Sequence, residues 1–136
     1  IQTIHITKDT QQALAALGVV ALYLFGSRAQ GREGPLSDYD FAVLMNRGQQ
    51  RGNDTYNALY NLLAPLCPRT LANDVIDIIF LRDAPLELAM HVIRYGKVLY
   101  DRDALTRARF EENTMCAYCD YRPILNMFDR VILASV

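Results

Sequence analysis

At 136 residues, with a formal net charge of −1, the chain has the length of one ordinary domain and no general attraction for polyanions. About half of its residues are hydrophobic, which excludes an intrinsically disordered chain and supplies enough apolar surface for a core. The sequence contains no signal peptide and no apolar run of membrane length. We therefore expect a single cytoplasmic domain over residues 1–136.

The N-terminal part of the chain predicts one helix followed by one buried strand. Residues 9–17 have helical spacing, with Asp9 or Thr10 as the N-cap and Gly18 directly after the end. The run VVALYLF, residues 19–25, is apolar throughout. A continuous apolar run of this length is typical of a strand that is covered on both faces, so we expect this strand in the centre of a sheet.

The middle of the chain predicts two further strands with a helix between them. Residues 39–45 form the second predicted strand, and a polar loop then leads to a helix over about 54–64. After a break between two prolines, residues 75–81 form a third apolar strand that contains one aspartate.

The C-terminal part predicts a helix, a short strand over 97–101 and a longer helix from Ala104 onward that is bent or interrupted near Pro123. Buried strands that alternate with helices indicate an α/β (α+β) fold around one mixed sheet. The first of these helices is opened by Asp83 and Pro85 and closed by Gly96, and its predicted apolar side consists of Leu86, Ala89, Met90 and Ile93.

Asp38 and Asp40 stand one residue apart at the start of the second predicted strand. Side chains at i and i+2 of a strand lie on the same face, so the two carboxylates share a face with their Cα atoms about 7 Å apart. Like charges at this distance repel each other, whereas a divalent cation binds both. Oxygen ligands with no nearby His or Cys favour Mg²⁺ over zinc. The alternative is an acidic turn that leads into a strand.

Asp77 is the one charged residue in the third predicted strand. A charge in an apolar strand costs several kcal/mol unless it is paired or bound to a metal. If this strand lies beside the strand of Asp38 and Asp40, the carboxylate of Asp77 joins the same cluster. The alternative is a residue at the end of a strand that forms a salt bridge with an arginine.

Gly26, Ser27 and Arg28 follow the first predicted strand and precede one potential helical turn. A chain that passes from a strand into a helical turn exposes free backbone N–H groups, which suit a phosphate. Gly26 allows close approach, Ser27 supplies a hydroxyl group and Arg28 adds positive charge. We therefore expect these residues to bind the phosphates of a nucleotide.

The order of these residues is Gly-Ser, ten residues, Asp-x-Asp and a later strand Asp, and it resembles the nucleotidyltransferase superfamily related to DNA polymerase β. Within the superfamily, the chain is similar to the minimal MNT type, the antitoxin half of HEPN/MNT toxin–antitoxin pairs. The segments that carry the likeness are LYLFGSRAQG, SDYDFAVL and IDIIFLRDAPLELAMHVIRYGKVLYD. The resemblance implies a polymerase β-like fold, with a mixed sheet flanked by helices and a helical C-terminal tail.

The resemblance also implies an activity, namely Mg²⁺-dependent transfer of AMP from ATP to a tyrosine of a partner HEPN ribonuclease toxin, which silences the toxin. Asp38 and Asp40 would hold the metal ions and Asp77 would hold the catalytic one. Gly26 and Ser27 would bind the terminal phosphates. Such a site works by positioning and by electrostatic stabilisation of the transferred phosphoryl group.

Three other functions compete with this one. The chain could neutralise a toxin by binding alone, although all three aspartates of the motif are present. It could adenylylate a small molecule such as an antibiotic, but its length leaves no second domain for a substrate pocket. Nucleic-acid polymerisation would require a basic or aromatic strand-binding surface that the sequence lacks, so we expect no direct binding of nucleic acid.

Two features of the C-terminal part have open interpretations. Cys116 and Cys119 are spaced like zinc ligands, but no fourth ligand stands at a suitable distance, so we expect them to fill small apolar spaces. The segment 124–133 has an apolar helical face, made of Ile124, Leu125, Phe128, Val131 and Ile132. This face either packs on its own domain or docks to another subunit.

Overall fold

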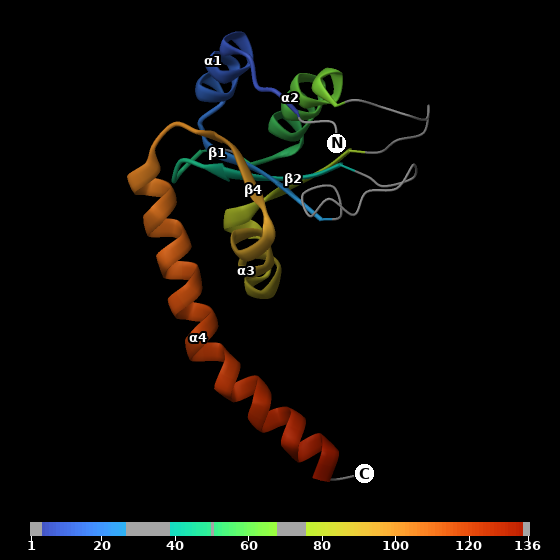
Figure 1. The fold of residues 1–136 in the computed structure, drawn as a ribbon, viewed down its shortest axis with the longest axis vertical. Coiled ribbons are helices and arrows are strands. Elements are labelled where there is room, and N and C mark those ends of the chain that lie inside the picture. The colour runs from blue at the N-terminus through green and yellow to red at the C-terminus, as the bar shows by residue number, and fades with distance from the viewer. Residues whose placement is uncertain (1–3, 27–38, 50, 68–75, 135–136) are drawn as a thin grey trace.

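The computed structural model describes residues 4–26, 39–49, 51–67 and 76–134, with side chains up to Asp120. Six helical segments and four strands follow one another along this part of the chain (Figure 1). They are α1 (Lys8–Ala16), β1 (Val19–Phe25), β2 (Tyr39–Met45), α2 (Asn53–Leu63), η1 (Ala64–Leu66), β3 (Ile76–Phe80), η2 (Leu81–Asp83), α3 (Leu86–Tyr95), β4 (Lys97–Asp101) and α4 (Ala104–Ala134).

The four strands form one mixed sheet in the order β3-β2-β1-β4. β1 is antiparallel to both β2 and β4, and β2 is parallel to β3. β1, the strand with a continuous apolar sequence, therefore lies in the centre beside β2, as the sequence predicts for residues 19–25. The predicted α/β fold with a mixed sheet flanked by helices is confirmed.

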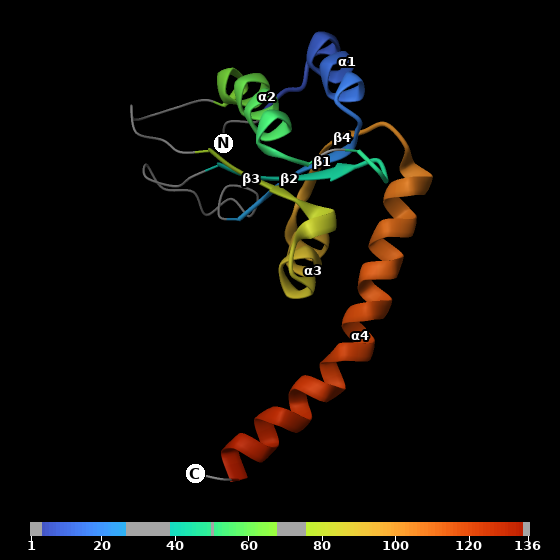
Figure 2. The ribbon, with the colours of Figure 1, turned by 180° about the vertical axis from the view of Figure 1, so that it is seen from behind.

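Helices cover both faces of the sheet, and each face has its own hydrophobic cluster (Figures 1 and 2). α1 and α2 lie on one side, where Leu22 and Phe41 from the strands meet Leu59 of α2. α3 lies on the other side, where Tyr23 of β1 and Val92 of α3 belong to one buried cluster. From Ala21 to Phe25, successive residues of β1 alternate between the two clusters, because side chains of a strand alternate between its faces.

α1 begins one residue earlier than predicted, and its N-cap is Thr7, so the assignment to Asp9 or Thr10 is wrong. The backbone of Thr7 is extended and its hydroxyl oxygen accepts the N–H of Thr10 at 3.3 Å. Thr10 is inside the helix and buried. Gly18 follows the helix end as predicted, with a left-handed φ of +86°.

α3 presents a different side to the core from the one predicted. Ala89 and Val92 are its buried residues, whereas Met90 and Ile93 are only half-buried. The cause is that α3 packs against the sheet on one side and against α4 on another, and Met90 lines a shallow pocket with Tyr118 of α4. The spacing of the apolar residues predicts one buried side of α3, and this predicted side lies between the two surfaces with which α3 contacts the sheet and α4.

α4 runs without a break through Pro123, so of the two predicted possibilities, a bend or an interruption, the interruption is absent. The helix is curved, and its C-terminal part stands away from the sheet (Figures 1 and 2). Its N-terminal part is bound to the sheet by polar contacts. The Tyr23 hydroxyl donates to the Glu111 carboxylate at 2.8 Å. Arg107 bridges Glu111 and Asp101 at 3.0 and 2.8 Å. The side chains of the predicted apolar face over 124–133 lie outside the described ones.

The length of α4 does not make it a membrane helix. No helix in the described ranges is long and apolar enough to cross a membrane. The two cysteines of α4, Cys116 and Cys119, are exposed. The expectation that they fill apolar spaces is therefore wrong within this chain. Cys67, by contrast, is buried behind α2, where its thiol donates to the carbonyl of Leu63 at 3.4 Å.

Candidate active site

Gly26 lies at the end of β1, directly beside the carboxylate of Asp40. The register of the antiparallel pair sets Phe25 opposite Asp40. Gly26 has a left-handed φ of +79°, and a Cβ atom at this position would overlap with Oδ2 of Asp40. A side chain here would therefore be strained and would also displace the carboxylate. The sequence predicts that Gly26 allows a phosphate to approach closely. In the structure, its missing side chain makes room for the carboxylate of Asp40, an aspartate of the same motif.

Asp40 and Asp77 are direct neighbours across the parallel pair of β2 and β3. Paired residues of adjacent strands have Cα atoms about 5 Å apart and point to the same face of the sheet. Ala42 and Ile79, two residues further along each strand, pack into the cluster on the α3 side, so the two carboxylates lie on that side. The expectation that the strand of Asp77 lies beside the strand of Asp40 is confirmed.

The electrostatic reason given for Asp77 is wrong, although its position is as expected. β3 is an edge strand, and Asp77 is exposed rather than buried. Its ionised form therefore carries no large cost of burial. No hydrogen bond or ion pair joins the side chain of Asp77 to a described residue, so the alternative of a salt bridge to an arginine has no support in this part of the chain.

Three of the six candidate residues, Ser27, Arg28 and Asp38, lie outside the described residues. Among the residues that are described, no group of three His, Cys, Asp or Glu side chains is placed to hold a metal ion. Asp40 and Asp77 form a pair of adjacent carboxylates, and oxygen donors of this kind suit Mg²⁺. The two described carboxylates therefore fit part of the ligand set of a magnesium site.

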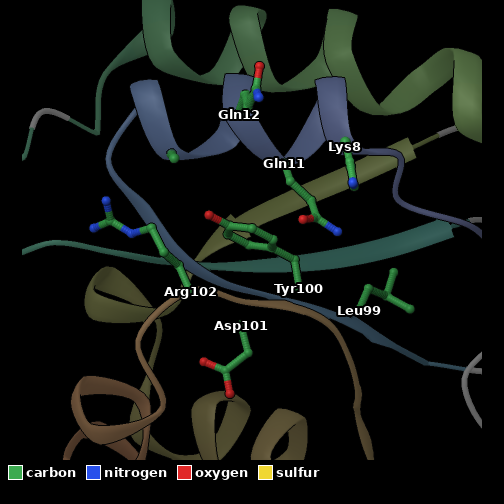
Figure 3. A pocket seen from close by; sticks show the side chains of 8 residues that line it. Lys8, Gln11, Gln12, Leu99, Tyr100, Asp101 and Arg102 are labelled. Atoms are coloured by element: carbon green, nitrogen blue, oxygen red, sulfur yellow. The ribbon is translucent and has the colours of Figure 1, made fainter.

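A pocket of about 510 Å³ lies on a different part of the molecule, between α1 and β4 (Figure 3). Lys8 and Gln11 of α1 face Tyr100 and Arg102 across it. Asp101 points to the opposite side of the strand, where Arg107 binds it. The pocket thus has no pair of adjacent carboxylates, and it does not compete with the end of β1 as the candidate active site.

The part of the sequence that forms the sheet and the candidate site matches a known protein family. Residues 8–105 match the family model described as Polymerase beta, Nucleotidyltransferase. The chain belongs to this nucleotidyltransferase family. The matched range contains every candidate site residue and all four strands of the described sheet.

One relative supports membership of the same family, and several solved structures have a similar fold. The Protein adenylyltransferase MntA of Aphanizomenon flos-aquae is 32% identical over 112 residues, which are 76% of this chain and 71% of the relative. A chain in a crystal structure of a toxin–antitoxin with AMP-PNP has a TM-score of 0.68 at 23% identity, over 93% of this chain and 99% of that one. A chain in the structure of a tri-AMPylated Shewanella oneidensis HEPN toxin with MNT antitoxin has a TM-score of 0.60 at 21% identity, over 92% and 98%. The two structures show that the fold is shared.

Proposed function

We propose that this chain is an antitoxin that transfers AMP from ATP to a tyrosine of a partner HEPN-type toxin and thereby neutralises it. The relative that is 32% identical over 112 residues is a protein adenylyltransferase. One structure with the same fold contains a tri-AMPylated HEPN toxin with an MNT antitoxin, and another contains AMP-PNP. Family membership limits the reaction to nucleotidyl transfer, and these relatives point to a protein as the acceptor.

The observation that carries the proposal is the register of Asp40 with Asp77, next to the turn at Gly26. Nucleotidyl transfer requires carboxylates that hold cations against a triphosphate and an acceptor oxygen close by. Two carboxylates on adjacent strands, with a glycine beside one of them, meet this requirement in the described part of the chain. A binding-only antitoxin would need neither feature.

We assign the metal-binding role to Asp38, Asp40 and Asp77. Mg²⁺, when bound, supplies positive charge that offsets the charge developing on the triphosphate. Asp77 is exposed at the edge of the sheet, so a tyrosine of a partner can reach it. We therefore also assign to Asp77 the orientation of the tyrosyl oxygen and acceptance of its proton. A bond forms between this oxygen and the α-phosphorus, the bond from the α-phosphorus to the bridging oxygen breaks, and pyrophosphate leaves.

We assign the binding of the terminal phosphates to Gly26, Ser27 and Arg28. Gly26 lies directly beside the Asp40 carboxylate, so a phosphate bound at this turn would be next to the proposed metal site. A hydroxyl group and a guanidinium group in the next two positions would donate hydrogen bonds to the same oxygens.

We further propose that residues 1–136 act as one nucleotidyltransferase domain in a reducing cytoplasm. Both hydrophobic clusters of the described residues share one sheet, which favours a single folding unit. None of the three cysteines forms a disulfide in the described part of the chain, which suits a reducing compartment.

The direct test is to incubate the chain with Mg-ATP and its candidate toxin and to weigh the toxin by mass spectrometry. We expect a gain of one or more AMP units, lost in Asp40→Asn and Asp77→Asn and kept in Asp9→Asn. Asp9 is an exposed aspartate of α1 on the opposite side of the sheet, so this variant controls for the change of charge. An unmodified toxin that the two site variants still neutralise fully would establish the binding-only antitoxin instead.

A further inference from the structure

A groove of about 1030 Å³ lies at the opposite end of β2 from the candidate active site. Its walls come from the segment after β2, from η2 and the start of α3, and from the first half of α4. Asp40 stands near the start of β2 and Asn46 follows its end, so the two places are about 20 Å apart along the strand. The lining residues are Asn46, Arg47, Gln49, Arg82, Leu86, Thr106, Arg109, Phe110, Asn113, Thr114 and Ala117.

The lining of this groove is positively charged. It includes Arg47, Arg82 and Arg109, and no aspartate or glutamate. Arg47 and Arg109 are exposed, and neither forms an ion pair or hydrogen bond with a described residue. The whole chain has a formal net charge of −1, so the groove is a local concentration of positive charge.

Arg82 is held in a fixed orientation at the centre of this group. Its Nε donates to the carbonyl oxygen of Met45 at 2.7 Å, and its guanidinium group lies over the ring of Phe110, 5.5 Å from the centroid. A guanidinium group has five N–H donors, so four remain on the two terminal nitrogens. Because its orientation is already fixed, little conformational entropy is lost when those donors bind a ligand.

The arginines also repel one another. The positive charges of Arg47 and Arg51 lower the pKa of Arg82, after burial as the larger cause. Arg51 is neutralised by Asp83 at 2.7 Å, but Asp83 does not line the groove. Gathering like charges without a counter-ion destabilises the folded chain, and an anion in the groove would remove that cost.

The lining residues indicate which class of anion this groove binds. One guanidinium group can donate two parallel hydrogen bonds to two oxygens of a phosphate group. Asn46, Gln49 and Asn113 offer side-chain amides of the kind that pair with the edge of a nucleobase, and Leu86 adds apolar surface. The volume is at the upper end of the range for small-molecule sites. We propose that this groove is a second nucleotide site, which binds a nucleoside oligophosphate through the three arginines.

This site is chemically distinct from the candidate active site. It offers no carboxylate to a metal ion, so the arginines themselves must neutralise the phosphates. Binding should therefore persist without divalent cations and weaken steeply with salt.

The test is an NMR titration of the ¹⁵N-labelled full chain with α,β-methylene ATP, which cannot lose pyrophosphate, in the absence of divalent cations. We expect shifts at the backbone amides of Arg47, Arg82 and Arg109. The double variant Arg47→Ala/Arg109→Ala should bind about 10- to 100-fold more weakly, because two charge-assisted contacts are lost. Both side chains are exposed, so the variant should fold, which its thermal unfolding curve checks.

The matched control is Arg94→Ala/Arg102→Ala, which removes the same charge at two exposed positions outside the groove. It should bind like the unmodified chain. Equal losses in the two double variants, or shifts confined to Gly26, Asp40 and Asp77, would overturn the proposal. Pyrophosphate binding as tightly as the nucleotide would refute the part assigned to the base. An oligoglutamate peptide that binds as tightly as the nucleotide would refute the proposal that the ligand is a phosphate compound.

Discussion

Replacement of Gly26 by alanine tests whether the turn after β1 sets the position of the Asp40 carboxylate. Gly26 has a φ of +79°, and its missing Cβ is the space that Oδ2 of Asp40 occupies. Gly26→Ala should therefore have two effects, strain in the backbone and displacement of a carboxylate. Gly48 separates them, because it has a φ of +78° and nothing within 4 Å of the position of a Cβ.

The two effects differ in size and in the assay that detects them. A left-handed backbone costs a residue with a side chain about 1–2 kcal/mol. Both Gly26→Ala and Gly48→Ala should lose this free energy of unfolding, which lowers Tm by about 3–8 °C for a chain of this length. A carboxylate moved by roughly 1 Å should lower the rate of AMP transfer about 100-fold, in Gly26→Ala alone.

The assays are thermal unfolding followed by circular dichroism and the initial rate of AMP addition to the toxin, followed by mass spectrometry below both Tm values. A Gly26→Ala variant that transfers AMP as fast as Gly48→Ala would refute the argument, because the strain would then be the only consequence of the substitution. A Gly48→Ala variant that loses activity to the same extent would refute it as well.

Further predictions follow from three other parts of the chain. Asp77→Asn should leave Tm within about 2 °C of the original, because the side chain is exposed at the sheet edge, and should slow AMP transfer by about 100-fold or more. Tyr23→Phe should lower the free energy of unfolding by about 1–3 kcal/mol in denaturant titrations, because Glu111 loses a donor. Burial and the hydrogen bond to Glu111 raise the pKa of Tyr23 above its usual value of about 10, so its contribution is present below pH 10 and is lost as the pH rises further. The original chain should accordingly lose more stability than Tyr23→Phe between about pH 9 and 11, and equal losses would contradict this assignment. In the isolated folded chain, Cys116 and Cys119 should react with a thiol reagent at once and the buried third cysteine only after unfolding, so a count of three fast thiols would be inconsistent with the fold.

The positions of the central strands were predictable because the local sequence indicates that these strands are buried. A run of seven apolar residues such as VVALYLF has no exposed face, and both central strands begin and end where the sequence indicates. The sheet order was not predictable in the same way, because pairing joins segments far apart in the chain. The edge position of β3 follows from that order, and it explains why an apolar strand contains an exposed aspartate.

The closeness of Asp40 and Asp77 was predictable from the sequence, but the exposure of Asp77 was not. The motif spacing selected Asp40 and Asp77, and the parallel register brings them together. The cost of a buried charge was the wrong reason for Asp77, since exposure depends on which strand closes the sheet. No local pattern marked the arginine groove, because Arg47, Arg82 and Arg109 meet only once β2, η2 and α4 are in place.

The polar contacts of α4 give a reason for the fixed position of the glycine turn. Tyr23 of β1 has a buried ring, and its hydroxyl group needs an acceptor, which Glu111 of α4 provides. β1 is also hydrogen-bonded to β2 on one side and to β4 on the other. The strand is therefore held on both edges and through Tyr23, only three residues before Gly26. A close approach between a backbone turn and a carboxylate persists only on a support of this kind, because a loosely held strand would relieve the crowding by moving.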